Sequence, residues 1–174
     1  MKPAVELRGF RPSDAPAVQA WFSDRETTAT LLEQRESFSE DEARAWVQRA
    51  IEPGGEDLKW AVTVDGRDEP AGFVALYGLG RQTAPELGVL IGDPEQRGRG
   101  VGREAIRLAA VRAFEAGAHR VYARILTGNE ASRRAFESLG FRREGLMRSH
   151  VRRGERLLDC EMWGLLPEDF EEGG

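Results

Sequence analysis

Cysteine and histidine are scarce in this chain, and long apolar runs are missing. The single cysteine, Cys160, excludes a disulfide within the chain, and its place in an apolar-rich run is typical of a buried core residue. The two histidines, His119 and His150, have no cysteine, histidine or carboxylate at metal-ligand spacing, so we expect no metal site. No apolar run is long enough to span a bilayer, so we expect no membrane-spanning segment.

The length of 174 residues and the 40% apolar content are those of one globular domain, which we expect to cover residues 1–174. Residues 166–174 are rich in acidic residues and glycine, and we expect them to form a loose tail. The amino-terminal residues lack a basic segment followed by an apolar stretch, which is the pattern of a secretory signal. We therefore expect a cytoplasmic protein.

Charge is unevenly distributed, although the net value is only −5. Residues 1–87 carry 10 basic and 16 acidic side chains, residues 88–160 carry 15 and 9, and residues 161–174 carry five acidic ones and no basic one. Only two of the 25 basic residues are lysines, which leaves 23 arginines. This skew fits either genomic base composition or guanidiniums that meet a phosphorylated ligand. The overall acidity argues against nucleic-acid binding.

The hydrophobic pattern predicts an α+β domain with a mixed sheet. Strands are expected where apolar residues alternate or cluster between turn signals, at residues 5–8, 58–64, 71–79, 86–91, 119–126, 141–146 and 157–165. Helices are expected from residue 12 through Trp21, at 39–51 behind a capping box, at 99–117 and at 130–139.

Turn signals punctuate these elements. Asp65-Gly66 predicts a hairpin turn, Pro53-Gly54-Gly55 ends the second helix, and Gly88 inside a strand indicates a bulge or a close approach by another group. Residues 23–37 have neither period, and we expect a stretch of this kind to line a substrate pocket.

A glycine-rich segment between the 86–91 strand and the 99–117 helix carries the clearest chemical signal. Residues 96–102 read Gln-Arg-Gly-Arg-Gly-Val-Gly. Glycines let the backbone turn tightly and direct successive N–H groups outward, while a helix amino terminus adds positive potential. The segment lacks the Gly-Lys-Ser/Thr of a Walker loop and the last glycine of a dinucleotide fingerprint. The pattern therefore indicates an anion cradle, and a simple tight connection fits it as well.

The pattern Arg97-x-x-Gly100-x-Gly102 resembles the pyrophosphate loop, Gln/Arg-x-x-Gly-x-Gly/Ala, of the GNAT superfamily of acetyl-CoA-dependent N-acetyltransferases. Other segments are similar to its Rim-type branch, which acetylates the amino termini of ribosomal proteins. They are Leu7-Arg8 followed by Asp14, Glu86-Leu87-Gly88, Gly92-Asp93-Pro94-Glu95, Asn129-x-x-Ser132, Leu139-Gly140-Phe141-x-x-Glu144-Gly145 and Asp159-x-x-x-Trp163-x-Leu165. The resemblance covers nearly the whole chain in order.

This resemblance implies a GNAT fold: a mostly antiparallel sheet of six to seven strands, about four flanking helices, and two strands that splay apart to admit the pantetheine arm of acetyl-CoA. We expect acetyl-CoA as co-substrate and no metal. By position, the implied cofactor contacts are Val89, Leu90, Ile91, Arg97, Gly98, Arg99, Gly100, Val101, Gly102 and Asn129. Val89 and Ile91 also suit an ordinary core strand, and Asn129 suits a helix N-cap equally well.

The implied reaction is direct attack of a neutral amine on the thioester in a ternary complex, with a strand N–H near Gly88 to Leu90 stabilising the oxyanion. Glu86 is a candidate to accept the amine proton through water, although a glutamate at a strand end is often merely solvated. Where many relatives protonate the departing thiolate with a tyrosine, this chain has Phe136. Ser132, water, or no protein acid at all remain as alternatives, and Ser132 also suits a solvent-facing helix position.

The acceptor is left open by the residues, and the amine pKa values favour one class. At pH 7 an α-amine of pKa about 7.8 is about 14% neutral and a lysine amine of pKa about 10.4 is about 0.04% neutral, a difference of about 3.5 kcal/mol. A site with few catalytic groups therefore suits the α-amine of a protein or peptide. Polyamine, antibiotic and amino-acid acceptors remain alternatives, as do a non-catalytic acyl-CoA-binding module and a nucleotide-phosphate binder. The sequence is compatible with a monomer or a homodimer.

Overall fold

A computed structural model describes residues 1–35, 37–52 and 56–170 of the chain. Seven strands form one sheet in the order β1-β2-β3-β4-β5-β7-β6. Every neighbouring pair is antiparallel except β4 and β5, which are parallel. The strands are β1 (Val5–Arg8), β2 (Leu58–Val64), β3 (Gly72–Tyr77), β4 (Glu86–Ile91), β5 (Val121–Leu126), β6 (Arg142–Arg153) and β7 (Arg156–Leu165). The predicted α+β domain with a mixed, mostly antiparallel sheet is confirmed.

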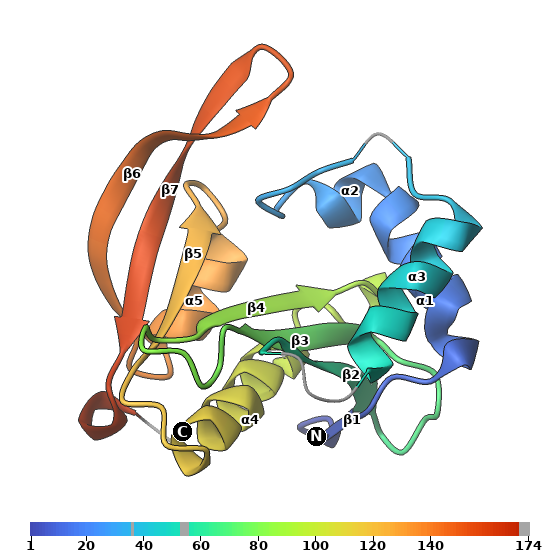
Figure 1. The fold of residues 1–174 in the computed structure, drawn as a ribbon, viewed down its shortest axis with the longest axis horizontal. Helices are drawn as coiled ribbons and strands as arrows, with labels where there is room; N and C mark the ends of the chain where they lie inside the picture. The colour runs from blue at the N-terminus through green and yellow to red at the C-terminus, as the bar shows by residue number, and fades with distance from the viewer. Residues whose placement is uncertain (36, 53–55, 171–174) are drawn as a thin grey trace.

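Helices cover both faces of this sheet (Figure 1). They are α1 (Ala15–Ser23), α2 (Arg25–Thr28), α3 (Glu40–Ile51), α4 (Val101–Glu115) and α5 (Glu130–Glu137), with short 3-10 turns η1 (Pro12–Asp14), η2 (Pro94–Gln96) and η3 (Pro167–Asp169). One buried cluster joins α4 and α5 to one face of β3 and β4, through residues such as Val74, Leu76, Leu87, Ile106 and Phe136. A second cluster joins α1 and α3 to the opposite face, through Val18, Val47, Phe73, Ala75 and Leu90.

The start of α3 follows directly from its sequence. The Ser39 hydroxyl accepts a hydrogen bond from the Glu42 N–H at 3.2 Å, and the Glu42 carboxylate accepts one from the Ser39 N–H at 2.8 Å. This reciprocal capping box satisfies two donors that the first helical turn leaves free. The hydrogen bond from the Ser39 N–H also lowers the pKa of Glu42. The predicted helix over 39–51 is confirmed, whereas its predicted end at Pro53-Gly54-Gly55 lies outside the described residues.

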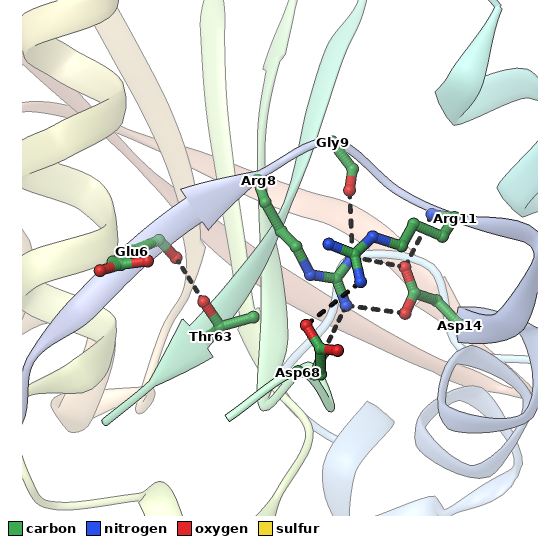
Figure 2. Close-up of polar contacts among 7 residues, drawn as sticks. All are labelled: Glu6, Arg8, Gly9, Arg11, Asp14, Thr63 and Asp68. Carbon is green, nitrogen blue, oxygen red and sulfur yellow. Dashed lines mark hydrogen bonds and ion pairs between the residues drawn. The ribbon is translucent and has the colours of Figure 1, made fainter. Parts of the chain in front are cut away.

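Arg8 anchors the connection between β1 and α1 (Figure 2). Its Nη1 and Nη2 donate to the two carboxylate oxygens of Asp14, both at 2.8 Å, and Nη2 also donates to the Asp68 carbonyl at 2.6 Å. The hydrogen bond to Asp14 raises the pKa of Arg8. Because Asp14 is only 4% exposed, this charge-assisted pair fixes the first helix against the edge of the sheet.

Gly88 does not form a bulge, because the register between β3 and β4 runs without a shift from Gly72↔Ile91 to Tyr77↔Glu86. The second expectation, a close approach by another group, is met by the Tyr77 ring. A Cβ on residue 88 would lie 3.1 Å from Tyr77 Cε2. Gly88 therefore leaves room for an aromatic ring on the face of the sheet that α1 and α3 cover.

The last hairpin is longer than the sequence predicts. We expected a strand that ended at residue 146, whereas β6 continues to Arg153 and pairs with β7 up to Arg153↔Arg156. The arginine-rich run hides the strand because most of its side chains are exposed and show no apolar alternation. Ser149, with φ +52, lies where the register shifts between Met147 and Val151.

The carboxyl-terminal segment packs closely as far as it is described. We expected a loose tail from residue 166. Instead the Phe170 ring lies 5.7 Å from the Phe114 ring, and Asp169 accepts a hydrogen bond from Arg142. These contacts hold residues 166–170 against the end of α4 and the start of β6, and residues 171–174 lie outside the described residues.

Candidate functional site

β4 and β5 splay apart as predicted. Within the described residues they pair only at Glu86 and Tyr122. The Gly92 N–H donates to the Ala71 carbonyl at 2.9 Å, which sets the phase of the β3–β4 ladder. Because antiparallel backbone groups alternate in direction, the N–H and C=O groups of Val89 and Ile91 point away from β3, towards β5. The free donor expected near Gly88 to Leu90 is therefore the Val89 N–H.

The glycine loop leads from this splay into α4. Gly98 and Gly100 have φ values of +71° and +84°, and a Cβ on either would meet nothing within 4 Å. Gly100 is the N-cap of α4, and its carbonyl accepts the Glu104 N–H at 3.0 Å. The N–H groups of Val101, Gly102 and Arg103 therefore have no intrahelical acceptor and lie at the positive end of a 15-residue helix. The loop has the open, donor-rich form that a phosphate group requires.

Arg97 holds this loop in place from within. Its Nε donates to the Ile91 carbonyl at 3.0 Å, and Nη2 donates to the Thr27 hydroxyl at 2.6 Å and the Gly92 carbonyl at 3.2 Å. Its Nη1 lies 3.7 Å from the exposed carboxylate of Glu26. Arg97 therefore connects the loop to β4 and α2 through hydrogen bonds. Of its three guanidinium nitrogens, only Nη1 has no acceptor within hydrogen-bond distance among the described residues.

Two further arginines flank the loop. Arg99 Nη1 donates to the Gln96 side chain at 2.6 Å, and Arg103 Nε donates to the Ser138 hydroxyl at 3.0 Å. The Val101 side chain is fully buried, so this residue presents only its backbone N–H to the loop surface. A Cβ on Gly102 would lie 3.5 Å from the Ile91 side chain, which places the helix start against β4.

A cavity of about 510 Å³ lies beside the splay. Four of the predicted site residues line it, Glu86, Val89, Asn129 and Ser132, and so does Phe136, which stands where the resemblance implies a tyrosine. Leu90 does not, because its side chain is buried in the cluster with α1 and α3. The other lining residues are Phe22, Thr30, Leu31, Leu32, Glu33, Arg35, Phe38, Trp46, Phe73, Tyr77, Leu87, Gly88, Arg124 and Ile125. The prediction that residues 23–37 line a pocket is confirmed for five of them, Thr30, Leu31, Leu32, Glu33 and Arg35.

Glu86 is held by an arginine that sequence reasoning missed. Arg124 Nε and Nη2 donate to the two Glu86 carboxylate oxygens at 2.7 and 2.8 Å, and the Tyr122 hydroxyl lies 3.4 Å from one of them. The hydrogen bond to Glu86 raises the pKa of Arg124. Arg124 Nη1 also lies 3.2 Å from His150 Nε2 on β6. Glu86 therefore has a fixed orientation at the edge of the cavity.

The start of α5 supplies the other predicted polar residues. The Asn129 side-chain oxygen accepts a hydrogen bond from the Ser132 N–H at 3.2 Å, so Asn129 is the N-cap of α5 and at the same time lines the cavity. Phe136 is 3% exposed and packs edge-on against Phe141 with ring centroids 4.8 Å apart. Its ring offers no proton donor at the position where the family resemblance implies a tyrosine.

Tyr77 is the second residue that sequence reasoning missed. Its side chain lines the cavity over Gly88, and its hydroxyl has no hydrogen-bond partner among the described residues. Burial raises the pKa of Tyr77 to about 12. The alternation Phe73, Ala75, Tyr77 on one strand face was the available signal, because it places Tyr77 on the face that carries Gly88.

A polar contact joins the β6–β7 hairpin to the segment that follows α2. Arg153, at the tip of the β6–β7 hairpin, donates to the Ala29 carbonyl at 2.6 Å and also to the Leu31 carbonyl. Figure 1 shows that hairpin on the side of β5 and the α2 segment on the side of α1 and α3. The contact therefore joins the hairpin to Leu31, a cavity-lining residue that is 122 positions away in sequence.

Two expected absences concern the described part of the chain. None of its helices has the length and apolar character needed to cross a membrane. Across residues 1–35, 37–52 and 56–170, no group of histidine, cysteine, aspartate and glutamate side chains is placed to hold a metal ion.

Comparison with known proteins gives consistent matches along most of the chain. Residues 4–142 match the family model of the acetyltransferase (GNAT) domain. The uncharacterized N-acetyltransferase YoaA of Bacillus subtilis (strain 168) is 27% identical over 163 residues, which cover 92% of each chain.

Solved structures share the fold. An acetyltransferase of the GNAT family from Bacillus anthracis superposes with a TM-score of 0.82 at 24% identity, covering 94% of this chain and 95% of that one. Spermidine N-acetyltransferase from Vibrio cholerae, solved with CoA and spermine, superposes with a TM-score of 0.84 at 20% identity, covering 95% and 96%. At these identities the two likenesses show the fold alone.

Proposed function

The chain belongs to the GNAT acetyltransferase family and is an acetyl-CoA-dependent N-acetyltransferase, and we propose that its acceptor is the α-amine of a protein or peptide. The observation that carries the proposal is the splay between β4 and β5. It leaves the backbone groups of Val89 and the N–H of Ile91 without a strand partner beside a cavity, and β4 leads into the glycine loop at the start of α4.

The residues present fit acetyl-CoA. The open space over Gly98 and Gly100, with the free N–H groups at the start of α4, suits a pyrophosphate. The Arg97 Nη1 and the half-exposed Arg99 side chain add positive charge there. The Val89 carbonyl and the Ile91 N–H, which face away from β3, suit the amide groups of a pantetheine arm. We assign Leu90 to shaping the strand, because its side chain is buried in the core, and we assign the backbone N–H groups of Val101 and Gly102 to the pyrophosphate.

The proposed chemistry makes an amine N–C bond and breaks the thioester C–S bond. The Val89 N–H donates to the developing oxyanion, in a region that the surrounding cavity walls keep partly free of water. Glu86, fixed by Arg124, accepts the amine proton through a water molecule. Acetyl-CoA supplies the activated acyl group, and the departing thiolate takes a proton from solvent.

Tyr77 and Ser132 are the hydroxyl groups that line the cavity near this reaction. We assign Tyr77 to donating a hydrogen bond beside Gly88, because its hydroxyl has no other partner among the described residues. Burial raises its pKa to about 12, so it keeps its proton throughout the working pH range and acts as a donor of hydrogen bonds. Ser132 remains a candidate only through its position at the start of α5.

The charges of the cavity support an α-amine over a polyamine. Its charged lining residues are two glutamates and two arginines. Glu86 is paired with Arg124, and Arg35 lies 3.0 Å from Glu42 outside the lining, so Glu33 is the one lining carboxylate without an ion-pair partner among the described residues. A polycation would need an excess of carboxylates, which the described lining residues do not supply. A single amine, about 14% neutral at pH 7, suits this small number of carboxylates better.

The Rim-type motifs support a finer proposal, that the acceptor is a ribosomal or other protein amino terminus. In the structure, two of these motifs meet at the cavity, Glu86-Leu87-Gly88 on β4 and Asn129-x-x-Ser132 on α5. The motif that begins at Arg8 and ends at Asp14 lies at the distant β1–α1 connection, where it has a structural role.

The test is release of free thiol from acetyl-CoA by the purified protein with a panel of amines. We expect release with peptides that have a free α-amine, and little with spermidine or with an Nα-blocked peptide. Tight CoA binding without any amine-dependent thiol release would show a binding module instead. Thermal stabilisation by ATP but not by CoA would show a nucleotide binder.

A further inference from the structure

One wall of the cavity is aromatic. Phe22 of α1 contacts three other rings, with centroids 4.9 Å from Phe38, 5.8 Å from Trp46 and 6.0 Å from Phe73. Trp46 of α3 and Phe73 of β3 are 5.1 Å apart. We call Phe22, Phe38, Trp46 and Phe73 the aromatic wall. Its members come from α1, β3, α3 and the segment before α3, and all four line the cavity.

Part of the ring surface of the aromatic wall is not covered by the protein's own side chains. Phe38 and Phe73 are buried, at 6% and 5% exposure, whereas Phe22 and Trp46 are half-buried. Apolar ring surface that faces a cavity of about 510 Å³ is available to a ligand. Burying apolar surface against such rings is favourable, and aromatic pairs add to that gain.

Polar partners for an acceptor side chain are few along this wall. The charged residues near it are Glu33 and Arg35, and both are exposed at the cavity rim. Arg35 donates to Glu42 at 3.0 Å and lies 5.6 Å from the Phe38 ring centroid, so its guanidinium is already engaged. A polar or charged side chain pressed against the wall would lose water without gaining a matching group.

The two halves of the cavity have different chemistry. Glu86, Gly88 and Val89 form the half that faces the splayed strands, and the aromatic wall forms the half under α1 and α3. Phe73 and Tyr77 both lie on β3, and Tyr77 covers Gly88, so the wall continues directly into the reacting half. An acceptor whose amine lies beside Gly88 would place a neighbouring side chain against these rings.

We propose that this enzyme selects α-amines whose own residue has a large apolar or aromatic side chain, and that the aromatic wall is the pocket for that side chain. The inference rests on the proposed α-amine acceptor and adds the chemical class of its first residue. It predicts that leucine and phenylalanine are preferred at the first position over alanine, serine and glutamate.

The test uses the full chain, acetyl-CoA and a set of short peptides that differ only in the first residue, with kcat/KM measured by thiol release. We expect phenylalanine and leucine peptides to exceed alanine and serine peptides by about tenfold or more. Equal values, or a preference for small or polar first residues, would overturn the selectivity. Absence of transfer to every peptide would instead overturn the proposed function, so the two failures are distinguishable.

Three variants test whether the aromatic wall is the pocket for the first side chain of the acceptor. Phe22→Ala should reduce the ratio of phenylalanine to alanine peptides several-fold, mainly through the KM of the phenylalanine peptide. Phe22→Leu keeps an apolar side chain of similar reach and should retain most of the ratio. Phe114→Ala removes a half-buried ring of the same kind, which packs on Phe170 away from the cavity, and should leave the ratio unchanged. An unchanged ratio in folded Phe22→Ala would overturn the assignment of the wall.

Discussion

Arg124 on β5 donates two hydrogen bonds to the carboxylate of Glu86 on β4, from Nε at 2.7 Å and from Nη2 at 2.8 Å. The pair lies beside the single paired position of β4 and β5, where the strands begin to separate. A carboxylate has about four lone-pair sites, so two such bonds leave sites for a water molecule. The arrangement fixes the Glu86 carboxylate at the cavity edge and leaves lone-pair sites that can accept further hydrogen bonds.

Replacing Glu86 with glutamine should lower kcat by about 100-fold if this carboxylate accepts the amine proton. The chain offers a matched control, because Arg120 makes the same two-bond contact with Glu144 outside the cavity. Glu144→Gln should leave kcat within about twofold. Steady-state rates with one peptide acceptor measure both variants. Full activity in Glu86→Gln would remove the proposed role of this group.

Removing the Tyr77 hydroxyl should lower kcat by about tenfold, with little change in the KM for acetyl-CoA. The other tyrosine, Tyr122, is the control, since its hydroxyl lies at a long 3.4 Å from Glu86 and outside the cavity lining. We therefore expect the kcat of Tyr77→Phe to be about tenfold below that of the wild-type protein and the kcat of Tyr122→Phe to be close to the wild-type value.

The raised pKa of Tyr77, about 12, gives a second test of its role, the pH dependence of the rate. The hydroxyl keeps its proton well above pH 9, so it should contribute no alkaline fall in rate between pH 8 and 10. The profiles of the wild-type protein and of Tyr77→Phe should be parallel over that range. A fall that only the wild-type protein shows would mean that Tyr77 ionises there and would contradict its burial.

Gly100→Glu should weaken CoA binding by at least about 100-fold, because a carboxylate would occupy the open space at the positive end of α4. Gly117→Glu is a matched control at the other end of the same helix. Gly117 has φ +88° and open space around its Cβ position, so the backbone strain is similar. Calorimetric titration with CoA measures both. Equal affinities would show that the loop does not bind the cofactor.

Burial raises the pKa of the Cys160 thiol from its ordinary value of 9.0 to about 11. In the unfolded chain the thiol ionises near 9, so this group's contribution to stability is complete below pH 9 and is lost as pH rises to about 11. The loss is about 2.7 kcal/mol for two pKa units. Urea unfolding at pH 8 and pH 10.5 should show a decline that is smaller in Cys160→Ala. The same decline in both proteins would contradict the shift.

Local patterns were sufficient for the elements that depend on neighbours in sequence. Ser39 and Glu42 predicted the start of α3 because a capping box involves residues three apart. The glycines at 98 and 100 predicted the loop because left-handed backbone favours glycine. The splay of β4 and β5 was implied by the family resemblance, and no residue pattern within either strand reveals it.

The parts that sequence reasoning missed depend on contacts between distant strands. Arg124 reaches Glu86 across 38 positions, and nothing near either residue marks the pair. Tyr77 gains its place from the register of β3 against β4, which exposes its ring to Gly88. Leu90 was expected at the cofactor, but strand alternation turns its side chain into the core under α1 and α3.

The central claim is transfer of an acetyl group to an α-amine, and one competition experiment tests it directly. A peptide that carries a free α-amine on phenylalanine and one lysine is incubated with the protein and acetyl-CoA, and fragment-ion mass spectrometry locates the acetyl group. The account predicts acetylation of the α-amine, with the lysine unmodified. Acetylation of the lysine, or no acetylation beyond the protein-free control, would contradict it.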